Sequence, residues 1–277
     1  MPRKKDIKLS GNSLVAVVFS KNRPLQLSLT LSGLSKCCLD AIDTVVLYTT
    51  TSFDQERAYD IVKTEYPTIR FCKENQFKAN LLHLLYDKTH VLFLVDDCIF
   101  VNHFSIKSIL STYLTIKTLG FSLRLGLNIN YCYPMRTNQK LKAYTGFEDF
   151  ILENWGHNEY DFGYPLELSS SLYSIDTIKE LLESGNYNNP NQLESYLDFN
   201  KGYFRDRKPL LAMFKQSVAF CAPMNKVQIV SANNRSSEND KYSVENLLKL
   251  YLDGVRINPD KFYSFVPGSP HQEVELL

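Results

Sequence analysis

The stretch that decides the fold is Val91-Leu-Phe-Leu-Val-Asp-Asp-Cys-Ile-Phe100, in which an apolar run meets two adjacent carboxylates. A short apolar run of this kind, bounded by polar residues, is typical of a parallel strand that is buried on both faces. Open α/β sheets bind their ligands beyond the carboxyl ends of such strands. We therefore expect Asp96 and Asp97 to lie at the edge of a ligand-binding crevice.

The adjacent carboxylates of Asp96 and Asp97 repel each other when both are ionised. A divalent cation between them, or a proton that they share, relieves this repulsion. A metal site is the first interpretation of the pair. An acidic corner that caps the next helix is the alternative.

The chain before Val91 alternates buried strands with helices. The expected strands are residues 14–19, 44–48 and 69–72, and the expected helices are residues 25–34, 56–63 and 77–86. Pro24 stands where the first of these helices would begin, a position at which proline is favoured. Such alternation predicts an α/β fold with a mostly parallel, doubly wound sheet and right-handed crossovers.

The pattern changes after residue 105. Residues 128–164 are rich in Asn, Tyr and Phe, and we expect functional loops there because disordered segments lack so many aromatic rings. Further strands are expected at 166–173 and near Val218, and further helices at 175–182, 191–197 and 244–252. The length favours a single domain spanning 1–277, with one half at 1–104 and a second half and tail at 105–277.

Composition excludes several classes of partner. Lys and Arg (31) nearly balance Asp and Glu (30), so no overall field recruits nucleic acid or an anionic membrane. No apolar stretch is long enough to span a bilayer, and no secretory signal is recognisable, so a soluble, cytoplasmic protein is expected. The six cysteines lack zinc-site spacing and are expected to be reduced thiols, mostly in apolar surroundings.

The order of the motifs resembles the nucleotide-binding half of GT-A fold glycosyltransferases, especially the inverting, family 2-like enzymes. The motifs are Phe19-Ser-Lys-Asn-Arg-Pro24, the helix start that bears Lys78, and Val95-Asp-Asp-Cys-Ile-Phe100. The resemblance covers about residues 13–104 and thins beyond them. It implies a GT-A, Rossmann-like sheet flanked by helices, with an elaborated C-terminal region for the acceptor and the metal.

The same resemblance implies an activity. Such enzymes move a sugar, often a hexose, from a nucleoside-diphosphate sugar to a hydroxyl acceptor, and here a UDP-sugar, Mn²⁺ or Mg²⁺, and inversion are expected. The cation neutralises the charge that develops on the departing diphosphate. The acceptor is not identified by the sequence.

The resemblance assigns the metal to Asp97 and, from the C-terminal tail, His271. Cys98 stands where many members carry a third acid, and a soft thiol among apolar residues is expected in the core instead. A histidine in a frayed tail is the alternative for His271. The residues expected to contact the donor are Phe19, Ser20, Lys21, Arg23, Thr49, Lys78 and Asp96.

Some of these donor contacts have structural alternatives. Arg23 suits a phosphate or carboxylate through its bidentate fork, but a surface ion pair would explain it equally. Lys78 is alternatively a solvated helix lysine. Many relatives hold the base with an acid after the second strand, where this chain has residues 49–52, so base selectivity stays open. Arg235, in the polar stretch 231–239, is interpreted as part of an ordinary surface loop, with closure over the donor as the alternative.

The general base must be a carboxylate that takes the proton of the acceptor hydroxyl. Glu194 is the first candidate and Asp161 the second. Because Asn191 precedes Glu194 by three residues, a capping box that only stabilises a helix start is the alternative for Glu194.

Two other functions compete with glycosyl transfer. A sugar-phosphate nucleotidyltransferase shares a similar sheet, but it normally needs a glycine-rich loop after the first strand, and residues 19–24 contain no glycine. A catalytically inactive nucleotide-sugar-binding module is the other alternative, since Cys98 and the threonine-rich corner depart from the family pattern.

Overall fold

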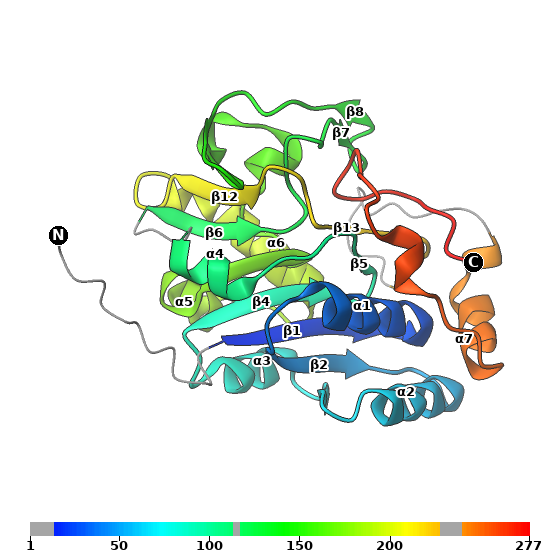
Figure 1. Cartoon of the computed structure of the whole chain (residues 1–277). Coiled ribbons are helices and arrows are strands. Elements are labelled where there is room, and N and C mark those ends of the chain that lie inside the picture. Colours follow the sequence, from blue (N-terminus) through cyan, green and yellow to red (C-terminus); the bar gives the residue numbers. More distant parts are fainter. Residues whose placement is uncertain (1–13, 113–116, 228–239) are drawn as a thin grey trace.

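The centre of the molecule is a nine-stranded sheet with the order β3-β2-β1-β4-β11-β6-β12-β10-β9 (Figure 1). The structure, a computed structural model, describes residues 14–112, 117–227 and 240–277. The N-terminal strands, all parallel, are β1 (Leu14–Lys21), β2 (Asp43–Thr49), β3 (Arg70–Lys73) and β4 (His90–Val95). The predicted α/β sheet is confirmed, and its order brings the ends of β1, β2 and β4 to one edge.

Alternating residues of β1 enter two different cores. Ala16 and Val18 belong to the core beneath α1 (Pro24–Cys37), α2 (Phe53–Glu65) and α7 (Val244–Leu252). Val15 and Val17 belong to the core on the opposite face, which α3 (Phe77–Leu85) and α5 (Ile175–Ser184) cover. Burial on both faces is why these strands read as unbroken apolar runs.

The C-terminal half extends the sheet with mixed directions. The strands are β6 (Thr118–Ser122), β9 (Tyr144–Gly146), β10 (Phe150–Asn154), β11 (Ser170–Ser174) and β12 (Leu210–Phe214). β11 runs antiparallel to β4 and to β6, β12 is parallel to β6, and β10 is antiparallel to its neighbours β12 and β9. The strand β12 was not predicted, and neither were β9 and β10, which lie in the stretch 128–164 that was expected to form loops. The strand expected from residue 166 begins only at Ser170.

Short elements complete this half. The helices are α4 (Ile106–Thr112) and α6 (Pro190–Phe199), and the 3₁₀ turns are η1 (Trp155–His157), η2 (Tyr160–Gly163), η3 (Lys201–Phe204), η4 (Asp240–Tyr242) and η5 (Pro259–Phe262). Two small ladders pair β5 (Cys98–Phe100) with β13 (Ala219–Cys221), and β7 (Tyr131–Cys132) with β8 (Thr137–Asn138). No helix among the described residues is long and apolar enough to cross a membrane.

The stretch from Val91 to Phe100 is divided by a turn at Asp96 and Asp97. Thr30, fully buried on α1, fixes this turn because its hydroxyl donates to the carbonyl oxygens of Asp96 (2.9 Å) and Cys98 (2.8 Å). Beyond the turn, β5 leaves the main sheet and pairs with β13. The Thr30 hydroxyl therefore holds the backbone on both sides of Asp97, which keeps the acidic pair at the edge of the sheet.

The packing of β6 against β11 predicts a strong effect of adding one methyl group at Gly120. A Cβ there would lie 2.6 Å from ring carbons of Tyr173 and 2.9 Å from the Leu172 carbonyl oxygen. Tyr173 is buried, and its hydroxyl is tied to the carbonyl oxygens of Pro165 and Glu167, so the ring has little freedom to move. Gly120→Ala should lower the free energy of unfolding by about 1–3 kcal/mol.

Urea denaturation of the variant tests this packing. Gly202→Ala is the matched control, since a Cβ at Gly202 meets nothing within 4 Å. That control should change stability by less than about 0.5 kcal/mol. Equal stability of both variants would contradict the tight contact between β6 and β11.

Candidate active site

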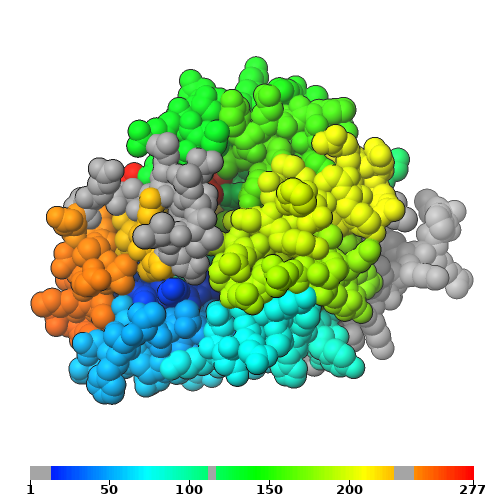
Figure 2. Space-filling view, turned by 180° about the vertical axis from the view of Figure 1, so that it is seen from behind, coloured from blue at the N-terminus to red at the C-terminus, as the bar shows by residue number. Residues whose placement is uncertain are grey.

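A cavity of about 850 Å³ opens at the carboxyl ends of β1, β2 and β4. In Figure 2 the N-terminal part of the chain, in dark blue, lies recessed between the light-blue and yellow-green parts. The cavity brings together nearly all of the residues that the sequence proposed for the site. Those that line it are Phe19, Ser20, Lys21, Arg23, Thr49, Asp96, Asp97, Asp161, Glu194 and His271.

Lys78 is the exception, because it is not among the residues that line the cavity. Its ammonium group donates to the carbonyl oxygens of Glu183 and Gly185, each at 2.6 Å. It also lies over the ring of Tyr187, 5.5 Å from the ring centre. These contacts join α3 to the end of α5. Lys78 is therefore neither a cavity residue nor a freely solvated lysine.

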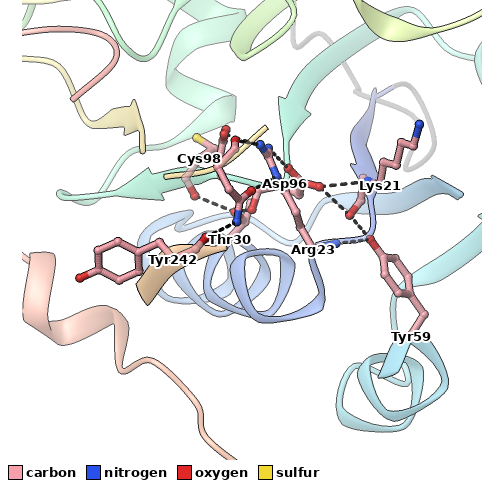
Figure 3. Close-up of polar contacts among 10 residues, drawn as sticks. Lys21, Arg23, Thr30, Tyr59, Asp96, Cys98 and Tyr242 are labelled. Carbon is pink, nitrogen blue, oxygen red and sulfur yellow. Dashed lines mark hydrogen bonds and ion pairs between the residues drawn. The ribbon is translucent and has the colours of Figure 1, made fainter. Parts of the chain in front are cut away.

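The Asp96 carboxylate fastens the end of β4 to the end of β1. Its Oδ2 accepts hydrogen bonds from the Ser20 hydroxyl at 2.9 Å and from the Lys21 amide at 3.1 Å. The Asp96 amide in turn donates to the Phe19 carbonyl oxygen at 3.1 Å. Figure 3 shows the Asp96 side chain between Lys21 and Arg23. Asp96 is 4% exposed, and these donors offset the cost of burying its charge.

Arg23 is the counter-charge of the acidic pair. Its Nη1 lies 3.1 Å from Asp96 Oδ1 and 3.1 Å from Asp97 Oδ2. The other side of the guanidinium donates to Asn225, from Nε to Oδ1 at 2.8 Å and from Nη2 to the carbonyl oxygen. Arg23 is also the residue that precedes α1, yet its side chain does not cap the helix. The surface-ion-pair alternative is wrong, because the side chain is only 12% exposed.

The electrostatic balance at Asp97 favours its neutral form more than usual. Burial raises the pKa of Asp97 to about 6, the Arg23 guanidinium opposes this rise, and the Asp96 carboxylate adds to it. Burial lowers the pKa of Arg23, but the Asp96 and Asp97 carboxylates together raise it by more, so the net shift is upward. Arg23 therefore stays charged, and its Nη1 pairs with Oδ2 of Asp97, a residue that lines the cavity.

A second buried cation, Arg124, was missed by the sequence reasoning. Arg124 is 1% exposed, and its Nε lies 3.4 Å from Glu167 Oε2 without hydrogen-bond geometry. Its Nη1 lies 3.3 Å from Nδ1 of His271. Burial lowers the pKa of Arg124, but Glu167 and Asp161 lead the groups that raise it, and the net shift is upward. The available signal was a single arginine within the apolar segment 120–126.

His271 is held firmly although it lies in the C-terminal tail. Its strand partner is Cys221, whose amide donates to the Pro270 carbonyl oxygen at 2.8 Å and whose carbonyl accepts from the Gln272 amide at 2.9 Å. The frayed-tail alternative is therefore wrong. Burial and the adjacent Arg124 charge lower the pKa of His271 to about 4, so the imidazole is neutral near pH 7.

Glu194 faces the cavity from the first turns of α6. The helix begins at Pro190 and is capped by Asn189, whose side chain accepts from the Gln192 amide at 2.9 Å. The capping-box alternative for Glu194 is thus wrong, because the reciprocal partner is Gln192, which accepts from the Asn188 amide. Glu194 Oε1 instead accepts from the Leu168 amide at 3.0 Å.

The environment of Glu194 prepares it to exchange a proton near neutral pH. Burial raises the pKa of Glu194 to about 7, the hydrogen bond from Leu168 lowers it, and the nearby Glu167 charge raises it. A general base works best when its pKa lies near the working pH. The geometry and the pKa together make Glu194 suitable for that task.

Asp161, the second candidate base, is more constrained than Glu194. It is 6% exposed, and its Oδ2 accepts from the Gln139 side chain at 2.7 Å, while its amide donates back to Gln139 Oε1 at 3.1 Å. The preceding Tyr160 has a φ of 54°, which is uncommon for a bulky residue. This turn holds Asp161 at the cavity wall and leaves the Tyr160 ring 42% exposed at the rim.

The corner of the cavity at the ends of β1, β2 and β3 contains an acid, Glu74, that the sequence did not predict for the site. Glu74 follows β3, lines the cavity with Lys21 and Thr49, and donates its amide to the Tyr48 carbonyl oxygen at 2.7 Å. Burial raises the pKa of Glu74, and the Lys21 charge opposes the rise. The corner thus has a carboxylate, supplied by the third strand.

Two residues of the cavity have side chains of the kind that bind divalent cations. The part of the chain that the structure describes contains no group of three His, Cys, Asp or Glu side chains able to hold a metal ion. Asp97 and the neutral His271 nevertheless line one cavity, and Mg²⁺ in nucleotide sites commonly relies on one or two carboxylates plus phosphate oxygens and water. Cys98 is fully buried in the core, as predicted, and offers no ligand.

Comparison with known proteins supports the resemblance seen in the motifs. No family model matches the chain. The bifunctional glycosyltransferase pgtA of Dictyostelium discoideum is 25% identical in an alignment 301 positions long that covers 92% of this chain and 37% of that protein. The chain is therefore similar, over nearly all of its length, to part of a glycosyltransferase. It spans little more than a third of that relative.

Solved structures overlap more loosely. S. aureus TarS has a TM-score of 0.43 at 11% identity, covering 73% of this chain and 35% of TarS. The 4-diphosphocytidyl-2C-methyl-D-erythritol synthase of Anaerococcus prevotii has a TM-score of 0.40 at 12% identity, covering 88% of this chain and 99% of that one. Neither overlap is close enough to carry a functional conclusion.

The pairing of Arg124 with Glu167 predicts a large effect on stability. Glu167 is 1% exposed and faces the buried guanidinium, so Glu167→Gln leaves a buried positive charge without its main compensation. Breaking one partner of a buried pair typically costs about 3–5 kcal/mol. The denaturation midpoint should fall accordingly.

The control is Asp253→Asn, which removes one partner of the exposed pair between Lys249 and Asp253. That change should cost no more than about 0.5 kcal/mol. If Glu167→Gln were as stable as this control, Arg124 would not depend on Glu167 for its charge balance.

Proposed function

We propose that this chain transfers a sugar, of the hexosyl type, from a nucleoside-diphosphate sugar to a hydroxyl acceptor, with inversion at the anomeric carbon. The observation that carries the proposal is one cavity shared by the acidic pair at the end of β4 and by Glu194 with its raised pKa. The similarity to a glycosyltransferase over 92% of the chain supports the same reaction class.

The donor is proposed to lie along the edge formed by β1, β2 and β4. The nucleoside faces the corner of Lys21, Thr49 and Glu74, where the acid and the hydroxyl offer hydrogen bonds to a base, and UDP is the proposed nucleotide. The diphosphate then extends past the acidic pair and Arg23. This direction places the sugar toward Arg124 and Glu194.

A cation is part of the proposal because the cavity is rich in acids. Six carboxyl side chains and four basic side chains line it, so a diphosphate needs additional positive charge to bind there. Asp97 and His271 would hold Mn²⁺ or Mg²⁺. When bound, such an ion acts as a Lewis acid that stabilises the negative charge of the departing diphosphate.

The proposed reaction is a single displacement. The acceptor oxygen attacks the anomeric carbon, the bond from that carbon to the diphosphate oxygen breaks with its electron pair on the diphosphate, and the hydroxyl proton passes to Glu194. Arg124 lies 3.3 Å from His271 and adds fixed positive charge on this side of the cavity. Pre-oriented charge of this kind needs no reorganisation during the reaction.

The acceptor is proposed to be a neutral molecule with an apolar face, such as a sugar ring. Asp161, Glu194 and Asp198 line the cavity near α6, and these carboxyl groups disfavour an anionic acceptor. Exposed apolar side chains lie among the lining residues, with Tyr160 42%, Met135 51% and Phe199 88% exposed. Aromatic faces of this kind suit stacking against the CH groups of a sugar.

Binding of the donor nucleotide tests the proposal first. UDP with Mn²⁺ should raise the melting temperature, since a ligand at a hundred times its dissociation constant adds about 2.7 kcal/mol of stability. UDP in chelator and Mn²⁺ alone should each give a much smaller shift. Equal shifts for UTP and UDP, with pyrophosphate released from UTP and a sugar phosphate, would favour the nucleotidyltransferase alternative instead.

Glu194→Gln separates catalysis from binding. Glutamine keeps the hydrogen bond to the Leu168 amide but cannot take a proton, so the transfer rate should fall about 10²- to 10⁴-fold while UDP affinity stays unchanged. In the wild type, the rate should rise with pH and level off above about pH 7, because the base must be ionised. The variant should lose that rise.

Glu183→Gln, which alters an exposed carboxylate of α5, is the control and should keep wild-type rates. Transfer by Glu194→Gln within a few-fold of wild type would move the base role to Asp161. Donor binding without any turnover in the wild type would support the inactive binding module.

A further inference from the structure

Arg23 is the one side chain that donates to the Asp97 carboxylate among the described residues, at 3.1 Å. Asp96 does not depend on it in the same way, because the Ser20 hydroxyl and the Lys21 amide also donate to Asp96. Removing Arg23 would therefore leave Asp97 without a side-chain donor, while Asp96 kept the Ser20 hydroxyl and the Lys21 amide. Loss of the Arg23 contact would therefore free the Asp97 carboxylate more completely than the Asp96 carboxylate.

Cation binding by the Asp97 carboxylate and the position of the Arg23 side chain depend on each other. A carboxylate oxygen that accepts a charged hydrogen bond from Nη1 is a weaker ligand, and a divalent ion beside it would repel the guanidinium. Arg23 also has a second anchor, since Nε and Nη2 donate to Asn225, whose own amide donates to the Tyr242 carbonyl oxygen at 2.7 Å. Figure 3 shows Arg23, Asp96 and Tyr242 around this network. The guanidinium can thus lose Asp97 and stay in the cavity.

We propose that Arg23 is a resident counter-ion that occupies Asp97 until the donor arrives, and that it exchanges Asp97 for a phosphate of the nucleotide when a divalent cation takes the carboxylate. The proposal rests on the function proposed above. It makes binding of the cation and the nucleotide cooperative, because Asp97 of the free protein is paired with Arg23 and binds the cation weakly. The cation and the diphosphate then enter together, and the diphosphate supplies the negative charge that Arg23 loses.

Mn²⁺ binding measured by electron paramagnetic resonance of the free ion tests the exchange without any turnover. In the wild type, Mn²⁺ should bind weakly alone and at least about tenfold more tightly with saturating UDP. Arg23→Gln should bind Mn²⁺ without nucleotide roughly 10- to 100-fold more tightly than the wild type, since one competing charged hydrogen bond is gone. The same variant should bind UDP with Mn²⁺ more weakly, since the phosphate loses its partner.

The matched control is Arg70→Gln. Arg70 pairs with Asp43 at the exposed far side of the sheet, so this variant loses the same charge without touching the cavity. It should bind Mn²⁺ and UDP as the wild type does. The double variant Arg23→Gln with Asp97→Asn should lose the gained Mn²⁺ affinity, which would assign the gain to Asp97.

The outcomes separate this inference from the proposed function. Equal Mn²⁺ affinity of wild type, Arg23→Gln and Arg70→Gln in the absence of nucleotide would overturn the exchange and leave the proposed function standing. Wild-type Mn²⁺ binding that UDP does not tighten, which by linkage is also UDP binding that Mn²⁺ does not tighten, would remove the cation from the proposed function and the exchange with it. If Arg23→Gln fails to fold by circular dichroism, Arg23→Lys takes its place. This variant keeps a charge but loses the fork, so it should bind Mn²⁺ alone more tightly than the wild type, and equal affinities would overturn the exchange.

Discussion

The placement of two adjacent carboxylates at the buried end of a strand is the constraint on which the site depends. Asp96 and Asp97 are tolerated there because the end of β1 and the start of α1 supply the compensation, through Ser20, the Lys21 amide and Arg23. These contacts join β1, β4 and α1 at one edge of the sheet. They also leave Asp97 with fewer donors than Asp96, and the different tasks proposed for the two acids rest on that asymmetry.

The cost of this arrangement is visible in the residue that precedes α1. Helix starts favour Ser, Thr, Asp or Asn, whose side chains satisfy a free backbone amide, but Arg23 makes no such bond. α2, α6 and α7 by contrast are capped by Ser52, Asn189 and Ser243. A local rule is thus broken where the side chain is needed in the cavity. Sites of this kind are where local and functional demands conflict.

A second group of buried charges organises the other side of the cavity. Arg124 on the segment after β6, Glu167 before β11 and His271 from the tail converge although they are far apart in the chain. Burial and the Arg124 charge lower the pKa of His271 and keep it neutral, and Glu167 raises the pKa of Arg124 and keeps it charged. Burial raises the pKa of Glu194, with Glu167 adding to the rise and Arg124 opposing it. The cavity therefore has one side built by the N-terminal strands, where the nucleotide is proposed to bind, and one side built by the C-terminal half, where the reaction is proposed to take place.

The sequence by itself determined the parallel strand-helix units and the edge at which Asp96 and Asp97 lie, because apolar periodicity and chain order fix which strand ends carry polar groups. The donor and metal residues that it proposed came from the resemblance to GT-A fold glycosyltransferases. Only the tertiary structure decided how those residues pair. The strand β12, the convergence of Arg124, Glu167 and His271, and the placement of Lys78 outside the cavity all depend on contacts between distant segments. Arg235 lies outside the described residues. Local patterns contain no information on such long-range contacts, which arise when two faces of one sheet are buried by different parts of the chain.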